Sequence, residues 1–104
     1  MKRTLFVGLL AGISFHSSAQ TLQQAIQATD REQFENATAS FKKLLAGSPT
    51  DGQAWFFMGE NYWANDRPDS AEACYRRGLE VNPRLPLNHA GLGKVLFAKG
   101  IPSN

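Results

Sequence analysis

Residues 55–85, which read WFFMGENYWANDRPDSAEACYRRGLEVNPRL, decide the fold of this chain. Large and small apolar side chains recur with helical spacing at Trp55, Met58, Gly59 and Tyr62, and a second such pattern begins at Ala71. Between them lies the polar stretch 65–68, which ends in a proline. Because proline lacks an amide hydrogen and disfavours helical geometry in the residue before it, the stretch predicts two helices separated by a short turn.

The chain repeats itself at an offset of 34 residues. Small residues recur at small positions, aromatic residues at aromatic positions, and proline at proline. Other equivalent positions, such as Asn61 and Val95, do not agree. The matching pairs are Ala25 and Gly59, Ala37 and Ala71, Phe41 and Tyr75, Leu45 and Leu79, Pro49 and Pro83, Met58 and Leu92, Gly59 and Gly93, Trp63 and Phe97, and Ala64 and Ala98.

This period divides the chain into units of two helices each. We predict a degenerate first repeat at 20–51, a well-formed repeat at 52–85, and the first helix of a truncated third repeat at 86–104, with that helix over 86–98. Asp69 and Glu72 have capping-box spacing, so we expect them at the start of a helix. The predicted fold class is all-α.

Small residues are expected where two helices cross closely, beside aromatic rings that fill the remaining space. Ala25 and Ala37 have this role in the first unit, with Phe41 as the ring. Further positions complete the set that we expect to pack the repeats. The additional members are Trp55, Gly59, Tyr62, Ala71, Tyr75, Pro83, Leu92 and Gly93.

The pattern Trp55-x2-Met58-Gly59-x2-Tyr62, followed by Ala71-x3-Tyr75 and Pro83, resembles the tetratricopeptide repeat. The resemblance implies a helix-turn-helix solenoid of about two and a half repeats. Three positions depart from the family pattern. Thr21 and His89 stand where the first and third repeats would have tryptophan, and Pro68 replaces the usual aromatic residue near the start of the second helix.

In this family the first helices of successive repeats line a concave groove that binds peptides or partner domains. The resemblance therefore implies a non-enzymatic interaction module or scaffold with a protein or peptide partner. The groove residues placed by helical spacing are Leu22, Ile26, Phe56, Glu60, Trp63, Lys94 and Phe97. Lys94 is the one basic residue among them, so the family's clamp for a peptide's terminal carboxylate is not assembled. The alternative for Phe56 and Trp63 is that a neighbouring helix covers them as core.

The last predicted helix carries apolar residues on several sides, and repeat arrays normally close with a polar helix. Three explanations remain open: the chain is a fragment of a longer array, the helix self-associates or meets a partner, or it caps the array imperfectly. The first leads to an alternative function, in which the chain is the N-terminal regulatory or docking fragment of a larger exported enzyme or sensor.

The first 19 residues predict a signal peptide cleaved after Ala19. Lys2 and Arg3 precede an apolar run from Leu5 to Ile13, which is shorter than the roughly 20 residues that cross a bilayer. The alternative is a buried helix or a retained anchor. We expect an exported protein, periplasmic or secreted, whose mature chain has no stable membrane insertion. Its layout resembles that of exported repeat proteins of Gram-negative bacteria, the Bacteroidetes type in particular.

Cleavage would remove two of the eleven basic residues, so that nine would face the nine acidic ones. A neutral chain without a run of basic residues has no concentrated positive charge to bind phosphates, which argues against nucleic acid as a partner. The mature chain would contain one cysteine, Cys74, and one histidine, His89. We therefore expect no metal site, no cofactor and no catalytic residues, with a packing role for both side chains.

Overall fold

The computed structural model describes residues 18–100, and its side chains from Thr21 onward. Within that range the chain forms α1 (Ser18–Asp30), α2 (Phe34–Gly47), α3 (Gly52–Ala64), α4 (Pro68–Val81) and α5 (Pro86–Ala98). The expected all-α solenoid of about two and a half repeats is confirmed. Most of the predicted signal peptide falls in residues 1–17, outside the described residues, and so do residues 101–104.

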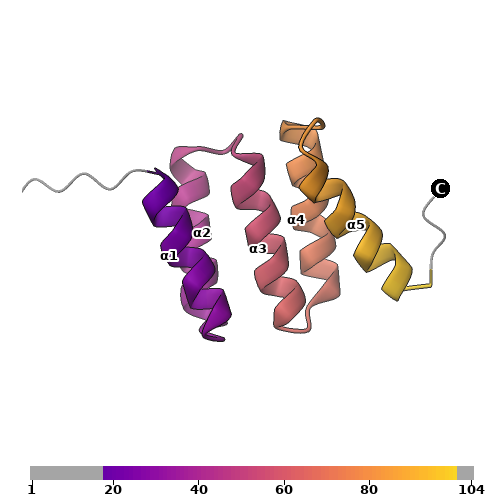
Figure 1. Cartoon of the computed structure of the whole chain (residues 1–104), viewed down its shortest axis with the longest axis horizontal. Coiled ribbons are helices and arrows are strands. Elements are labelled where there is room, and N and C mark those ends of the chain that lie inside the picture. The colour runs from indigo at the N-terminus through magenta and orange to yellow at the C-terminus, as the bar shows by residue number, and fades with distance from the viewer. Residues whose placement is uncertain (1–17, 101–104) are drawn as a thin grey trace, which may run out of the picture.

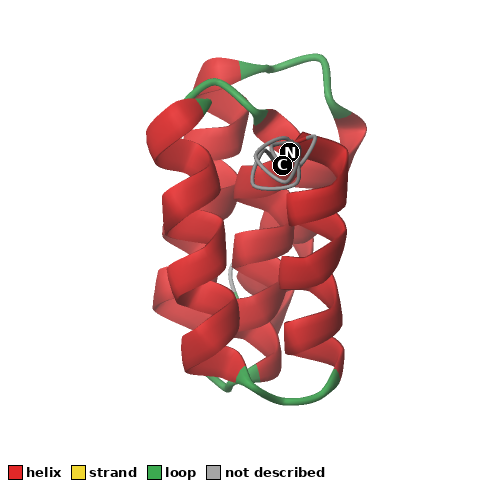
Figure 2. Cartoon of the chain, turned by 90° about the vertical axis from the view of Figure 1, so that its left-hand side faces the viewer, coloured by secondary structure: helices red, strands yellow, loops and turns green. Residues whose placement is uncertain are grey.

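The helices form two layers (Figure 1). Helices α1, α3 and α5 lie side by side in the front layer, with α2 and α4 behind them. Each helix packs against the next one along the chain, and α3 also contacts α1 and α5. Seen from the end in Figure 2, the helices run alongside one another with turns at both ends. The three first helices of the repeats therefore share one face.

A residue with left-handed backbone conformation follows each first helix in all three units. Glu32, Asp66 and Gly100 lie 34 residues apart, and each has a left-handed conformation, with φ of 61°, 59° and 79°. The amides of Gln33 and Arg67 donate to carbonyls five residues earlier, as in a Schellman motif. Helix α5 thus ends in the same left-handed conformation as α1 and α3.

The observed start of α4 differs from one expectation drawn from the sequence. Helix α4 begins at Pro68, whose fixed φ suits the first helical position, and no side chain caps it. Asp69 and Glu72 lie near the start of the helix, as expected, but both are already inside it, so the capping box predicted for them is wrong. A side-chain cap is found instead at α3, where the Asp51 carboxylate accepts hydrogen bonds from the amides of Gln53 and Ala54.

Among the side chains that the structure describes, the core consists of two clusters, one in the first part of the solenoid and one between α4 and α5. The first cluster comprises Ala25, Ala37, Phe41, Leu45, Ala54, Met58 and Cys74. The second comprises Ala71, Tyr75 and Val95, with Phe56, Tyr62, Trp63 and Leu92 packed against it. Trp55 also packs against the first cluster, and its indole donates a hydrogen bond to the Pro49 carbonyl.

Glycines allow the fully buried Tyr75 ring to fit between α3 and α5. A methyl group at Gly59 would come within 2.6 Å of this ring, and one at Gly91 would overlap it as well. Gly93 was expected to pack in the same way as Gly59. A Cβ there would meet no atom of the described chain within 4 Å, so Gly91 has the packing role instead.

The hydrogen bonds of Asn61 explain why the 34-residue repeat has a polar residue at this position and Val95 at the equivalent one. Both residues are fully buried at equivalent positions, but Asn61 joins the first repeat to the second by hydrogen bonds. Its amide nitrogen donates to the Phe34 carbonyl at 3.2 Å and to the Thr38 hydroxyl at 2.9 Å, and its oxygen accepts from the Thr29 hydroxyl at 2.8 Å. A buried polar side chain with all these partners is tolerated where an unpaired one would be costly.

Candidate functional site

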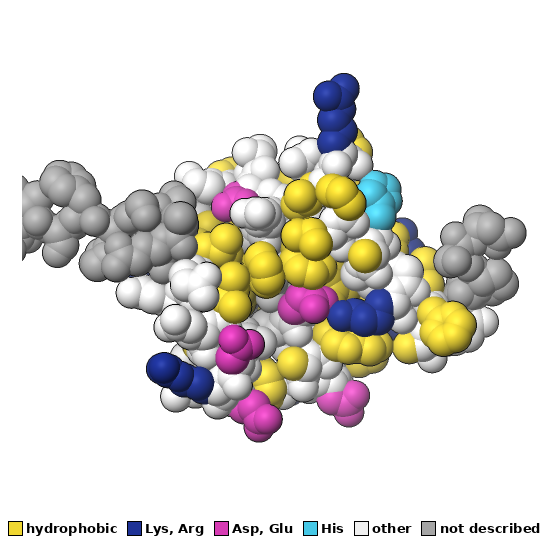
Figure 3. All heavy atoms as spheres, viewed as in Figure 1, with side chains coloured by type: hydrophobic (Ala, Val, Ile, Leu, Met, Phe, Trp, Pro, Cys, Tyr) yellow, Lys and Arg dark blue, Asp and Glu magenta, His cyan; other side chains and the backbone are white. Residues whose placement is uncertain are grey.

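All seven residues predicted to line the groove lie on α1, α3 and α5, the helices of the front layer. Figure 3 shows this face, with hydrophobic side chains forming a band over the three helices and with acidic and basic side chains next to each other near the middle of the band. Such a mostly apolar surface with a few polar groups is typical of interaction sites.

The centre of this face is an ion pair between two neighbouring repeats. The Lys94 ammonium on α5 lies 2.7 Å from Oε1 of Glu60 on α3, and the two side chains are 36% and 34% exposed. The Tyr75 hydroxyl donates to the same carboxylate oxygen from below. Burial is the main cause that raises the pKa of Tyr75 far above its ordinary value, so its hydroxyl keeps its proton and remains a donor. Two groups, the Lys94 ammonium and the Tyr75 hydroxyl, thus fix the Glu60 carboxylate.

Phe56 and Trp63 are neither fully core nor fully surface. Each is partly buried and packs against the second core cluster. The Phe56 ring lies 5.9 Å from that of Tyr75, measured between centroids, while the Lys94 ammonium lies 5.0 Å from the Trp63 ring. Removing either ring would therefore disturb both the core and the surface.

The outer members of the predicted groove differ from each other in exposure. Leu22 and Ile26 on α1 are partly buried against the first core cluster. Phe97 near the end of α5 is 84% exposed, which leaves almost the whole ring open to solvent. The face therefore offers partly covered apolar side chains at one end and a free aromatic ring at the other.

A recess between α1 and α3 opens on the same side and includes residues that the sequence analysis did not select. It is lined by Ile26, Thr29, Asp30, Phe57 and Glu60. Phe57 stands three residues before Glu60, on the same side of a helix, and this spacing was the available signal. Thr29 and Asp30 had no comparable signal, because their relevance depends on how α1 packs against α3.

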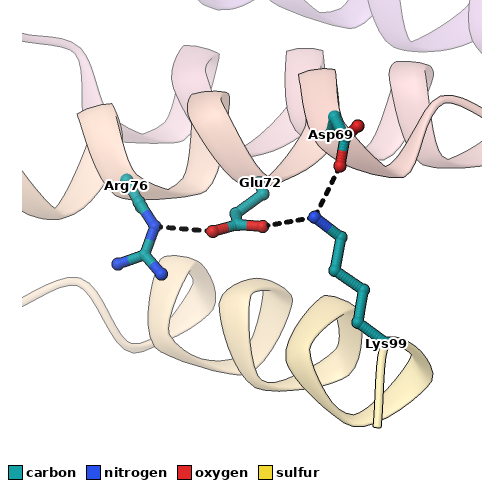
Figure 4. Close-up of polar contacts among 4 residues, drawn as sticks. All are labelled: Asp69, Glu72, Arg76 and Lys99. Atoms are coloured by element: carbon teal, nitrogen blue, oxygen red, sulfur yellow. Dashed lines mark hydrogen bonds and ion pairs between the residues drawn. The ribbon is translucent and has the colours of Figure 1, made fainter. Parts of the chain in front are cut away.

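Helix α5 is held in place by charged residues at its end (Figure 4). The Lys99 ammonium lies 2.5 Å from an Asp69 oxygen and 2.7 Å from a Glu72 oxygen, and the other Glu72 oxygen accepts from Arg76 at 2.8 Å. The hydrogen bond from Lys99 is the main cause that lowers the pKa of Glu72. We call these four residues the α4–α5 clamp. It fixes the helix that carries Lys94 and Phe97.

Cys74 and His89 do not form a reactive pair. Cys74 is buried in the first core cluster, and burial raises the pKa of its thiol to about 12. His89 was expected to pack between helices, but its side chain is exposed, and a ring nitrogen lies 2.9 Å from the Pro83 carbonyl. This contact matches the one from Trp55 to Pro49, 34 residues earlier. His89 thus replaces the tryptophan as a link to the preceding turn.

Residues 18–100 contain no cluster of three or more histidine, cysteine, aspartate or glutamate side chains that could hold a metal ion. In the same part of the chain, none of the helices is both long and apolar enough to cross a membrane.

Comparison with known proteins agrees with the geometry. The family model described as tetratricopeptide repeat matches residues 28–95. A curated relative, tetratricopeptide repeat protein 37 of Xenopus laevis, is 28% identical over 74 residues, which is 71% of this chain and 5% of that protein. The chain therefore spans a small fraction of the relative's length. Tetratricopeptide repeats generally mediate protein–protein interactions. The family match covers more than half of the sequence, and the chain belongs to the tetratricopeptide repeat family.

Proposed function

We propose that this chain is a non-enzymatic interaction module that binds a peptide or a protein segment through the shared face of α1, α3 and α5. The observation that carries the proposal is the apolar band on this face, with the exposed Phe97 ring at one end and the Glu60–Lys94 pair at its centre. Aromatic side chains at such sites commonly anchor partners, and a fixed ion pair adds specificity.

The geometry supports a segment that runs across the repeats rather than a ligand held within one of them. Helices α1, α3 and α5 lie side by side, so a bound chain crossing them would meet Ile26, the Glu60–Lys94 pair and Phe97 in turn. Each repeat contributes its own side chains to one continuous surface, as is usual in solenoid proteins.

The test uses peptides selected by phage display from a random dodecapeptide library on the full chain. Phe97→Ala should weaken binding of the selected peptides without lowering the melting temperature, because the Phe97 side chain is largely exposed. Lys42→Ala, an exposed residue on α2 in the rear layer, is the control and should leave binding unchanged. Selected peptides whose binding is insensitive to Phe97→Ala and lost in Lys42→Ala would place the site elsewhere.

We also propose that the module acts outside the cytoplasm, on the basis of residues 1–19 alone. Expression of the full chain in a Gram-negative host should yield a periplasmic product whose first residue is Gln20. Intact-mass measurement of the purified product decides this, and a product that retains Lys2 and Arg3 would contradict the proposal.

A further inference from the structure

We infer that the recess between α1 and α3 binds a basic side chain, lysine or arginine, of the bound peptide. The inference rests on the proposed function and adds to it the chemical class of one recognised side chain. It concerns the recess lined by Ile26, Thr29, Asp30, Phe57 and Glu60.

The size and the walls of the recess suit one long side chain. Its volume is about 140 Å³, below the roughly 300–1,000 Å³ of pockets that hold drug-sized ligands. Ile26 and Phe57 supply apolar walls from opposite helices, and both are packed against the first core cluster, so they are held in position. The methylene groups of lysine or arginine bury against such walls while the charged end reaches polar groups.

The polar groups that line the recess offer acceptors. Asp30 is an exposed carboxylate at the end of α1. In Glu60, Oε1 accepts from both Lys94 and Tyr75, and among the described contacts none uses Oε2. The single proton of the Thr29 hydroxyl is donated to Asn61, which leaves its oxygen lone pairs. A ligand that fits must therefore bring donors, and ammonium and guanidinium groups bring several.

The charges on this face also disfavour an acidic side chain in the recess. Its lining residues include two carboxylates and no basic residue. The neighbouring Lys94 is already paired with Glu60 at 2.7 Å and lies over the Trp63 ring. A peptide carboxylate would have to compete with Glu60 for Lys94 while approaching Asp30. A peptide cation meets Asp30 and the second Glu60 oxygen without breaking that pair.

The test is an NMR titration of the isotope-labelled full chain with four pentapeptide mixtures. Their central residue is lysine, arginine, norleucine or glutamate, and the flanking positions vary over apolar residues. Norleucine keeps the lysine stem and lacks its charge. The lysine and arginine mixtures should bind on the order of five- to tenfold more tightly than the norleucine mixture, since hydrogen bonds between charged groups are the strong ones. The amide signals of Asp30 and Phe57 should shift.

Asp30→Asn should remove the tighter binding of the lysine and arginine mixtures relative to the norleucine mixture. The substitution keeps the size of an exposed side chain and deletes its charge. Glu35→Gln is the matched control, an exposed glutamate on α2 in the rear layer, and should preserve the advantage. Glu60→Gln serves as a second variant and should reduce it as well.

Three results would overturn the inference. Equal binding of the lysine and norleucine mixtures, with shifts on α1, α3 and α5, would keep the proposed function and remove the basic-residue preference. Tightest binding of the glutamate mixture would assign recognition to Lys94. Absence of shifts on these three helices with every mixture would count against both the inference and the proposed function.

Discussion

Asn61 is the residue on which the junction between the first two repeats depends. Its side chain is fully buried and bonds to groups on α1 and α2, so it fixes how the first repeat sits against the second. The equivalent position in the next unit holds Val95, which packs against Ala71 and Tyr75 with no polar partner required. The same place in the fold is therefore filled in two different ways.

Asn61→Val should destabilise the protein by about 2–3 kcal/mol, because buried partners that lose a hydrogen bond carry a desolvation penalty. Urea unfolding of the variant and of the wild type, followed by circular dichroism, measures this. The reciprocal change Val95→Asn should also destabilise, since it buries an amide among apolar side chains. Asn61→Val with the stability of the wild type would show that the hydrogen bonds add nothing at this junction.

At the residue scale, the sequence identified the small and aromatic core positions better than the polar ones. Ala37, Phe41 and Ala71 follow helical spacing and are fully buried. The roles of Asn61 and Thr29 depend on partners from other helices, which spacing along one helix does not reveal. Gly93 matched Gly59 in sequence, yet contacts with a second helix decide whether such a glycine packs.

Within a helix pair, substitutions at Gly59 and Gly93 test how far stability depends on the close approach of a glycine to a neighbouring helix. Gly59→Ala should cost about 1–3 kcal/mol, because its methyl group would overlap the buried Tyr75 ring. Gly93→Ala is the matched control. It should leave stability unchanged or raise it by up to about 1 kcal/mol, since alanine favours helices and the site is open.

Thermal and urea unfolding of both variants measure the difference. A Gly93→Ala variant as unstable as Gly59→Ala would mean that another helix covers Gly93 in solution. Such a result would bear on the self-association that the apolar last helix suggests.

The ion pairs of the α4–α5 clamp should make the stability of the fold depend on pH. The pKa of Glu72 lies below the ordinary value of 4.5, so its ion pairs stabilise the fold while the carboxylate is ionised, and this contribution is lost as the pH falls through the lowered pKa. The pKa of Lys99 is raised above 10.5, mainly by its hydrogen bond to Asp69, so its contribution is present below that value and lost in strong base.

Glu72→Gln should therefore lower the urea midpoint modestly at neutral pH. The difference from the wild type should be smaller at pH 3, because the wild-type carboxylate takes up its proton as the pH falls through its lowered pKa. Glu35→Gln, with an exposed side chain on α2, serves as the comparison and should show little difference at either pH. A Glu72→Gln effect of the same size at both values of pH would mean that packing, and not charge, explains it.

At the scale of the whole molecule, the 34-residue period was sufficient to predict the number and order of the helices. The expected last helix, 86–98, coincides with α5, and the repeated turns at Glu32, Asp66 and Gly100 explain why the period is so regular. The composition of the shared face could be predicted in part, because helical spacing places Glu60 and Lys94 on it. The recess could not, because it forms only where α1 and α3 meet.

A partner that binds across the first helices of the repeats should contact α1, α3 and α5. NMR cross-saturation transfer from an unlabelled bound peptide, selected on the full chain, to the amides of the labelled protein measures this contact. Saturation should reach amides of α1, α3 and α5, including Ile26, Glu60 and Lys94, and spare the exposed side of α2 and α4. Saturation concentrated on α2 and α4 would contradict binding across the first helices.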